Sequence, residues 1–299
     1  MPGTLNYIEG SATLDGQALG QANAGSAQLQ PGQTITTADG RAEVLLTPGV
    51  FLRLGHDSAV RMISPDITDT AVAIEHGRAA VEVDQLFPQN NIHILVDKVP
   101  VQLIKTGLYE FNADNNTALV LNGEAAIDKG DRHWMKVKSG HEVNFSAGTA
   151  EVNATKFNVN EAENSGLYRW SSLRSDYLAE ANQQMAPEYA GYGPGWYWDP
   201  YMVDYTFLGP YAFMSPFGWG FYPLGWGGLY GPGFYGGFYG RPGFYGRGDV
   251  PVGRGSLGAG HASGFRSGAF RSGGELGGFH GGGGFGGFHG GGGFGGHGR

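Results

Sequence analysis

Residues 29–46 read Leu29-Gln30-Pro31-Gly32-Gln33-Thr34-Ile35-Thr36-Thr37-Ala38-Asp39-Gly40-Arg41-Ala42-Glu43-Val44-Leu45-Leu46, and they set the pattern of the first half of this chain. A threonine-rich run is followed by the turn residues Asp39-Gly40. After the turn, Ala42, Val44 and Leu46 alternate with charged residues. Successive side chains of a strand point to opposite faces of a sheet. The period of two therefore predicts β-strands that bury one face.

The same alternation continues from Leu5 to about Phe157. Charged residues such as Glu43 and Arg53 fall on the face opposite the apolar ones, so we expect a half-buried sheet. Turn residues that favour positive φ separate the apolar segments. These turns are Thr47-Pro48-Gly49, Glu75-His76-Gly77, Asn122-Gly123, Asp128-Lys129-Gly130 and Lys138-Ser139-Gly140. Short strands with such turns predict an all-β sandwich, barrel or roll over residues 4–160.

Four segments in this order resemble the FecR domain. The first is 29–46, and the others are Pro48-Gly49-Val50-Phe51-Leu52-Arg53-Leu54, Val72-Ala73-Ile74-Glu75-His76-Gly77-Arg78-Ala79 and Leu119-Val120-Leu121-Asn122-Gly123-Glu124-Ala125. The resemblance covers roughly residues 4–146 and implies a twisted β-solenoid or roll of short strands outside the cytoplasm. In the iron-uptake regulators of that family, such a domain passes a signal from an outer-membrane receptor to an anti-sigma region. Neither anti-sigma helices nor a membrane span are visible in this sequence, so the resemblance implies only a sensory or binding module for this chain.

The arrangement as a whole is similar to bacterial envelope proteins that join a FecR-like domain to a tail rich in Tyr, Trp and Gly. That likeness implies a periplasmic or extracellular location. No basic and then apolar leader precedes the first strand, and no run of about 18 apolar residues is visible. We therefore expect Met1 to begin a mature or truncated form, and we expect no transmembrane segment in this chain.

Charge and composition divide the chain near residue 190. Residues 1–190 carry 13 Lys and Arg against 23 Asp and Glu, within a net charge of −8 for the whole chain. An acidic folded part argues against nucleic acid as a partner, because phosphate binding needs clustered basic residues. The absence of cysteine excludes disulfides, thiolate catalysis and cysteine zinc sites.

One amphipathic helix is predicted between Leu167 and Gln184, within a capping segment at residues 165–186. An apolar stripe recurs at three and four residues, and it consists of Leu167, Trp170, Leu173, Tyr177, Leu178 and Ala181. The opposite face carries Arg169, Arg174, Asp176 and Glu180. Pro187 is expected to end the helix. We expect the stripe either to cap an open end or face of the β domain or to bind a partner.

Residues 191–247 form an aromatic and glycine-rich segment for which three arrangements compete. In the first arrangement, the segment folds back in part, with Trp196, Trp198, Phe207 and Trp219 packed against the β domain. In the second, it forms an exposed surface for sugar polymers or another protein. In the third, it inserts shallowly at a membrane interface. The candidates for partner binding are Trp196, Trp198, Trp219 and Tyr222.

Residues 248–299 form a low-complexity tail of Gly, Phe and His. Glycine loses the most backbone entropy on ordering, and isolated Phe residues bury too little surface to offset that loss. We expect this tail to be disordered and to support weak self-association. Its histidines, His261, His280, His289 and His297, have no preset ligand geometry, so either incidental composition or loose metal capture accounts for them.

No catalytic constellation stands out along the chain, so we expect no enzyme activity, no cofactor and no metal site. The aromatic segment offers only Asp199 and Asp204 as a carboxylate pair for polysaccharide hydrolysis. The leading hypothesis is a non-enzymatic binding or structural module of the cell envelope whose partner is a protein or an envelope polymer. The alternative is a sensory component of FecR-type signalling linked to a sigma factor.

Overall fold

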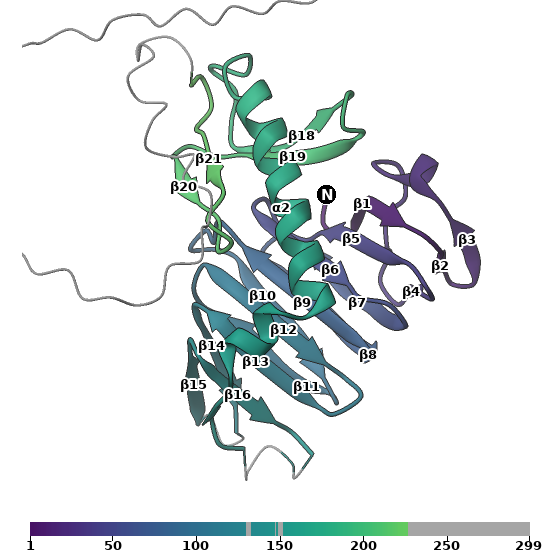
Figure 1. Ribbon diagram of the computed structural model, residues 1–299, viewed down its shortest axis with the longest axis vertical. Helices are drawn as coiled ribbons and strands as arrows, with labels where there is room; N and C mark the ends of the chain where they lie inside the picture. The colour runs from purple at the N-terminus through teal and green to yellow at the C-terminus, as the bar shows by residue number, and fades with distance from the viewer. Residues whose placement is uncertain (130–132, 147, 149–151, 227–299) are drawn as a thin grey trace, which may run out of the picture. The chain divides into compact units, whose positions relative to one another are not determined.

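A computed structural model describes residues 1–129, 133–146, 148 and 152–226 (Figure 1). Contacts divide the chain into two units, residues 1–244 and 245–299. The predicted tail at 248–299, its histidines and residues 227–247 of the aromatic segment lie outside the described residues. Within the described part, strands dominate and one long helix is present, which confirms the all-β prediction with a single main helix.

Eight strands form the first sheet, which we call sheet A. In spatial order they are β1 (Thr4–Glu9), β5 (Arg41–Leu45), β6 (Val50–Leu54), β9 (Arg78–Val83), β12 (Gly107–Asn112), β13 (Thr117–Asn122), β16 (His141–Asn144) and β17 (Thr155–Lys156). All neighbouring strands of sheet A are antiparallel.

Nine strands form the second sheet, sheet B. In spatial order they are β15 (Trp134–Lys138), β14 (Glu124–Asp128), β11 (Val99–Leu103), β10 (Asn91–Val96), β8 (Asp69–His76), β7 (Ser58–Asp66), β4 (Thr34–Thr37), β2 (Ala12–Leu14) and β3 (Gln17–Leu19). The chain passes repeatedly between the two sheets. It leaves β8, runs through β9 in sheet A and returns as β10, which lies parallel to β8.

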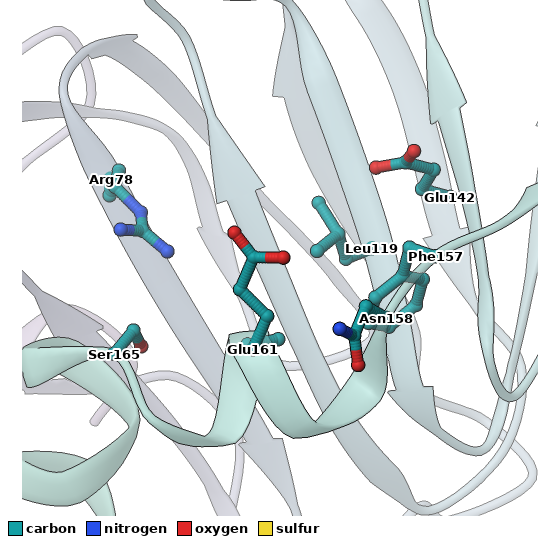
Figure 2. A pocket seen from close by; sticks show the side chains of 8 residues that line it. Arg78, Leu119, Glu142, Phe157, Asn158, Glu161 and Ser165 are labelled. Carbon is teal, nitrogen blue, oxygen red and sulfur yellow. The ribbon is translucent and has the colours of Figure 1, made fainter.

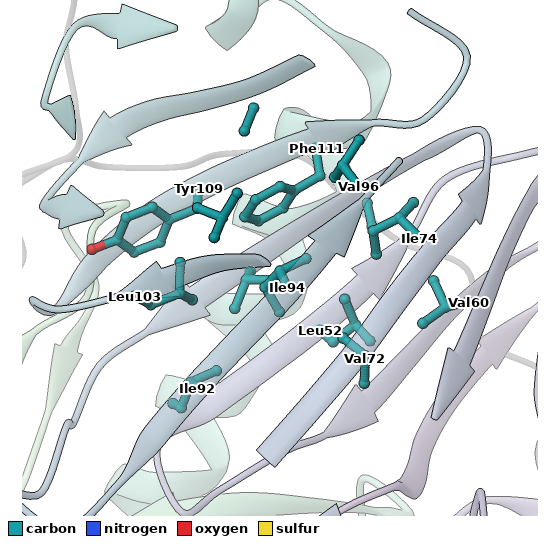
Figure 3. Packing of buried hydrophobic residues seen from close by; sticks show 14 of the residues in the cluster. Leu52, Val60, Val72, Ile74, Ile92, Ile94, Val96, Leu103, Tyr109 and Phe111 are labelled. Atoms are coloured by element: carbon teal, nitrogen blue, oxygen red, sulfur yellow. The ribbon is translucent and has the colours of Figure 1, made fainter. Parts of the chain in front are cut away.

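The apolar residues that alternate along the strands meet between the two sheets (Figure 3). Leu52 and Phe111 of sheet A and Val72 and Ile94 of sheet B are almost fully buried there. Tyr109 is also buried in this core, and its hydroxyl donates a hydrogen bond to the carbonyl oxygen of Lys105 at 2.6 Å. Burial raises the pKa of Tyr109 to about 12. The period of two thus identified the core face of both sheets.

The long helix, α2 (Gly166–Met185), crosses the other face of sheet A (Figure 1). A short helix, α1 (Val159–Glu163), precedes it, and a 3₁₀ turn, η1 (Gln21–Asn23), lies near the N-terminus. Ser165 caps α2 by accepting a hydrogen bond from the Tyr168 N–H at 3.1 Å. Two small hairpins follow, β18 (Gly195–Asp199) with β19 (Asp204–Leu208), and β20 (Phe213–Met214) with β21 (Gly220–Phe221). The helix predicted between Leu167 and Gln184 is therefore present.

The predicted faces of the helix are only partly right. Leu167, Trp170, Leu178 and Ala181 of the apolar stripe are buried. Leu173 and Tyr177, however, are 47% and 39% exposed.

Arg174, which the sequence placed on the outer face of the helix, is buried against sheet A. The physical reason lies in the sheet, because the face that α2 covers carries charged side chains and needs charged or polar partners.

Candidate functional site

Three charged side chains lie on the face of sheet A that points away from the core. They are Glu43 on β5, Arg53 on β6 and Glu82 on β9, and each is 0% exposed. Glu43 and Arg53 are direct cross-strand partners. The sequence placed Glu43 and Arg53 on the polar face of a half-buried sheet. That expectation is corrected, because α2 and the β18–β19 hairpin bury this face as well.

Five residues form a buried charge network between sheet A, α2 and the hairpin. The network consists of Glu43, Arg53, Glu82, Arg174 and Asp204. Arg53 donates from Nε to Glu43 Oε2 at 2.7 Å and from Nη1 to Glu82 Oε2 at 2.5 Å. Arg174 on α2 donates from Nη2 to Glu43 Oε1 at 3.0 Å and to Asp204 Oδ2 at 2.7 Å. The two arginines therefore link three segments that are distant in the sequence.

Neutral groups add further hydrogen bonds to the carboxylates of the charge network. Asn6 donates from Nδ2 to Glu43 Oε1 at 2.9 Å, and Ser175 donates from Oγ to Glu82 Oε1 at 2.7 Å. Asn6 also accepts a hydrogen bond from the backbone N–H of Tyr205 at 2.7 Å. The side chain of Asn6 thus joins the first strand of sheet A to the hairpin, 199 positions later in the chain.

Burial and ion pairing act in opposite directions on the carboxyl groups of this network. Burial alone would raise the pKa of Glu43, but Arg174 and Arg53 outweigh it and lower that pKa to about 2. Burial raises the pKa of Asp204 to about 6, and Arg174 opposes this only in part. Burial and the carboxylate of Glu82 raise the pKa of nearby Asp84 well above its usual range. Glu43 is therefore ionised at neutral pH, where it pairs with both arginines.

An apolar cluster completes the interface beside the charge network. It consists of Leu45, Phe51, Leu178, Ala179, Phe207 and Phe221. The indole of Trp196 packs on this cluster, with its ring centroid 4.9 Å from that of Phe51 and 5.8 Å from that of Phe207. The hairpin is therefore held by apolar packing as well as by charge.

The four residues predicted to bind a partner are all half-buried. Trp196 and Trp198 share strand β18, where Trp198 packs on Tyr205 at 5.0 Å between ring centroids. Trp219 donates from Nε1 to the carbonyl oxygen of Ser172 on α2 at 2.9 Å. The backbone N–H of Tyr222 donates to Asn182 Oδ1 at 2.6 Å. The described part of the aromatic segment thus folds back against the β body, and the partner-binding role of these four residues stays a prediction.

Three tyrosines of the same region are exposed instead, and sequence reasoning did not single them out. Tyr192, Tyr201 and Tyr211 are 64%, 87% and 75% exposed, and we call them the tyrosine set. Tyr201 lies in the turn beyond the Asp199–Asp204 pair, which closes one end of the hairpin. Tyr192 precedes and Tyr211 follows the Gly195–Leu208 pair at the other end. Neither composition nor periodicity separates these tyrosines from their packed neighbours.

The two carboxylates considered for polysaccharide hydrolysis both have structural contacts. Asp199 and Asp204 are each 1% exposed. Asp199 Oδ1 accepts a hydrogen bond from the backbone N–H of Tyr201 at 2.8 Å, and Asp204 pairs with Arg174. Across the described ranges, no group of three or more His, Cys, Asp and Glu is placed to hold a metal ion. In the same ranges, no helix has the length and apolar character needed to cross a membrane.

Comparisons with known proteins give a partial structural likeness. No family model matches the chain, and no curated protein matches it. Two crystal structures, at 2.50 Å and 1.65 Å resolution, are similar to part of it, and both are described as a "putative anti-sigma factor" from Parabacteroides distasonis ATCC 8503. Each shares 14% identity over 43% of this chain, with a TM-score of 0.36. The chain covers 62% of the length of those structures, and we infer no function from a likeness of this size.

Proposed function

We propose that this chain is a non-enzymatic binding module of the bacterial cell envelope, located in the periplasm or outside the cell, and that its tyrosine set contacts the partner. The observation that carries the proposal is Tyr201, which is 87% exposed at the turn of a firmly anchored hairpin. The resemblance of residues 29–46 and the three later segments to the FecR domain supports the location.

The anchoring of the hairpin matters because a rigid aromatic side chain loses little entropy on binding. Asp204 at the base of the turn is held by Arg174, and Tyr205 is held by Asn6. A tyrosine presents a broad apolar face and a hydroxyl at the same time. Such side chains stack on the apolar faces of sugar rings and on exposed apolar groups of proteins. The partner is accordingly a protein or an envelope polymer.

Binding to an envelope polymer is tested by cosedimentation of the full chain with purified peptidoglycan sacculi. The test variant is the triple substitution Tyr192→Ala, Tyr201→Ala and Tyr211→Ala. We expect it to weaken cosedimentation by at least about ten-fold, because exposed aromatic anchors carry much of the energy of an interface. The matched control is Tyr177→Ala, which removes a partly exposed tyrosine from α2.

Binding to a protein is tested by crosslinking from the same three positions in intact cells, followed by identification of the captured protein. If the tyrosine set matters, crosslinks form from Tyr201 and not from Tyr177. Fractionation of native cells tests the location. Native full-length protein found only in the cytosol, or a triple variant that binds both kinds of partner as well as the parent, would overturn the proposal.

A second candidate is a sensory component of FecR-type signalling. It is favoured by the buried charged interface between sheet A and α2, where Arg174 pairs with both Glu43 and Asp204. Deletion of the gene should then alter transcription driven by a specific sigma factor. Unchanged transcription in the deletion strain would exclude this role.

A further inference from the structure

A pocket of about 490 Å³ lies between α1, the start of α2 and the outer face of sheet A (Figure 2). It is separate from the tyrosine set, and its residues come from several elements. Arg78 comes from β9, Leu119 from β13 and Glu142 from β16, and Glu161 comes from α1. The volume lies within the range of sites that take a small molecule or a few side chains.

The floor of the pocket is apolar. Leu119 and Phe157 are half-buried and pack against the buried Ala162 of α1. Figure 2 shows Leu119 and Phe157 next to each other between Glu161 and Glu142. A half-buried aliphatic and aromatic surface of this kind gains free energy when an apolar group covers it. The floor therefore suits a ligand with a hydrocarbon portion.

The walls of the pocket are acidic. Glu142 and Glu161 form no ion pair with any residue that the structure describes. Arg78 is the basic residue of the lining, and it donates from Nε to Glu110 Oε1 at 2.8 Å. Glu110 is almost fully buried, so Arg78 and Glu110 neutralise each other. Among the described residues, the pocket thus keeps two carboxylates without a counter-charge.

One further polar group is open at the rim. Asn158 is exposed, and its side chain makes no capping hydrogen bond to α1. The amide of an asparagine both donates and accepts hydrogen bonds, so it matches the peptide groups of an extended chain.

We propose that this pocket binds an arginine or lysine side chain from an extended segment of a protein partner. The hydrocarbon stem covers Leu119 and Phe157, the cationic head lies between Glu142 and Glu161, and Asn158 contacts the peptide backbone. Long basic side chains combine an apolar stem with a charged head in the way that this lining requires. The charge complementarity of two uncompensated carboxylates excludes an acidic segment.

The test uses the full chain labelled with ¹⁵N and a heptapeptide in which one arginine is flanked by alanine and glycine. We expect saturable chemical-shift changes at Leu119, Phe157 and Glu161, with a dissociation constant of about 1 mM for a single side chain. The lysine peptide should bind within a few-fold of the arginine peptide. The citrulline peptide has the same shape without the charge, and it should bind roughly ten-fold more weakly.

The test variant is Glu142→Gln combined with Glu161→Gln, and the control is Glu163→Gln on the same helix, outside the lining. The double variant should bind the arginine peptide roughly ten-fold more weakly, whereas the control variant should bind it with unchanged affinity. An unchanged thermal unfolding curve shows that the variants fold. The triple tyrosine variant should bind this peptide normally, so failure of the pocket and failure of the proposed function are distinguishable. The pocket proposal would be overturned if the citrulline peptide bound as tightly as the arginine peptide. It would also be overturned if the chemical-shift changes lay elsewhere in the chain, or if the double variant bound the arginine peptide as tightly as the parent.

Discussion

Arg174 Nη2 of helix α2 lies 3.0 Å from Glu43 Oε1 of strand β5, and the two residues are 131 positions apart in the chain. Both side chains are buried, and the same nitrogen also lies 2.7 Å from Asp204 Oδ2 of the hairpin. This guanidinium group therefore links the β body, the helix and the hairpin whose turn carries Tyr201.

Replacement of Arg174 by methionine should destabilise the protein strongly. Methionine fills much of the same volume but leaves Glu43 and Asp204 buried with fewer partners. Breaking a buried ion pair costs roughly 3 to 5 kcal/mol of unfolding free energy, which urea denaturation measures. Arg169→Met is the matched control, because Arg169 is exposed on the same helix, and it should change stability by less than about 0.5 kcal/mol. Similar losses in both variants would show that the charge network does not stabilise the fold.

Asp204 should make stability fall as the pH rises. Its pKa is raised from 3.8 to about 6 in the folded state, so between these values the folded protein keeps a proton that the unfolded chain has lost. Stability therefore declines through this window, by on the order of 2 to 3 kcal/mol. Glu43 has the opposite sign, because its pKa is lowered from 4.5 to about 2 and its contribution is lost as the pH falls through that range.

Urea denaturation of the parent and of Asp204→Asn at pH values from 4.5 to 7 isolates the Asp204 contribution. The difference in unfolding free energy between the two proteins should change between pH 4.5 and about 6, in favour of Asp204→Asn at the higher pH, and should level off above the folded pKa. A difference that stays constant with pH would show that Asp204 titrates normally.

Trp196 and Tyr201 should differ in their effect on stability although they are five positions apart. Trp196 packs on Phe51 and Phe207, so Trp196→Ala should lower the unfolding free energy by about 3 kcal/mol. Tyr201 is 87% exposed, so Tyr201→Ala should lower it by less than about 0.5 kcal/mol. Chemical denaturation measures both values. The reverse order would mean that the hairpin does not pack on sheet A.

Gly77 and Gly140 should respond differently to alanine although both have positive φ, at 68° and 77°. A Cβ at Gly140 meets open space, so Gly140→Ala should cost only the backbone strain of about 1 to 2 kcal/mol. A Cβ at Gly77 would overlap the carbonyl oxygen of Asp57 and the side chain of Ser58. Gly77→Ala should therefore cost roughly 1 to 3 kcal/mol more, by thermal or urea unfolding. Equal costs would show that the β8–β9 turn relaxes freely.

Much of the fold was predictable from local pattern. The period of two identified Ala42, Val44 and Leu46 as core residues, because a strand separates its two faces by geometry alone. The turn glycines Gly77 and Gly140 have the positive φ that their sequence context predicted. The helix between Leu167 and Gln184 was also evident from its apolar spacing and its following proline.

The candidate sites were less predictable. Four aromatic residues were proposed to bind a partner, and the structure shows them half-buried, with Trp196 and Trp219 in contact with the body. The exposure of Tyr201 and the pocket beside Glu161 depend on tertiary contacts between segments that are distant in the chain. A local pattern does not predict such contacts, because it contains only the spacing of residues along the chain.

The sequence by itself determined the strands, their core-facing side and the position of one helix, since each follows from the rotation per residue of the backbone. Only the tertiary structure decided that the second face of sheet A is buried and that Arg174 turns towards it. Charged side chains such as Glu43 and Arg53 are stable in the interior only when opposite charges reach them. Here Glu43 and Glu82 of the same sheet pair with Arg53, and the second counter-charge of Glu43 is Arg174 of α2, more than a hundred residues later in the chain.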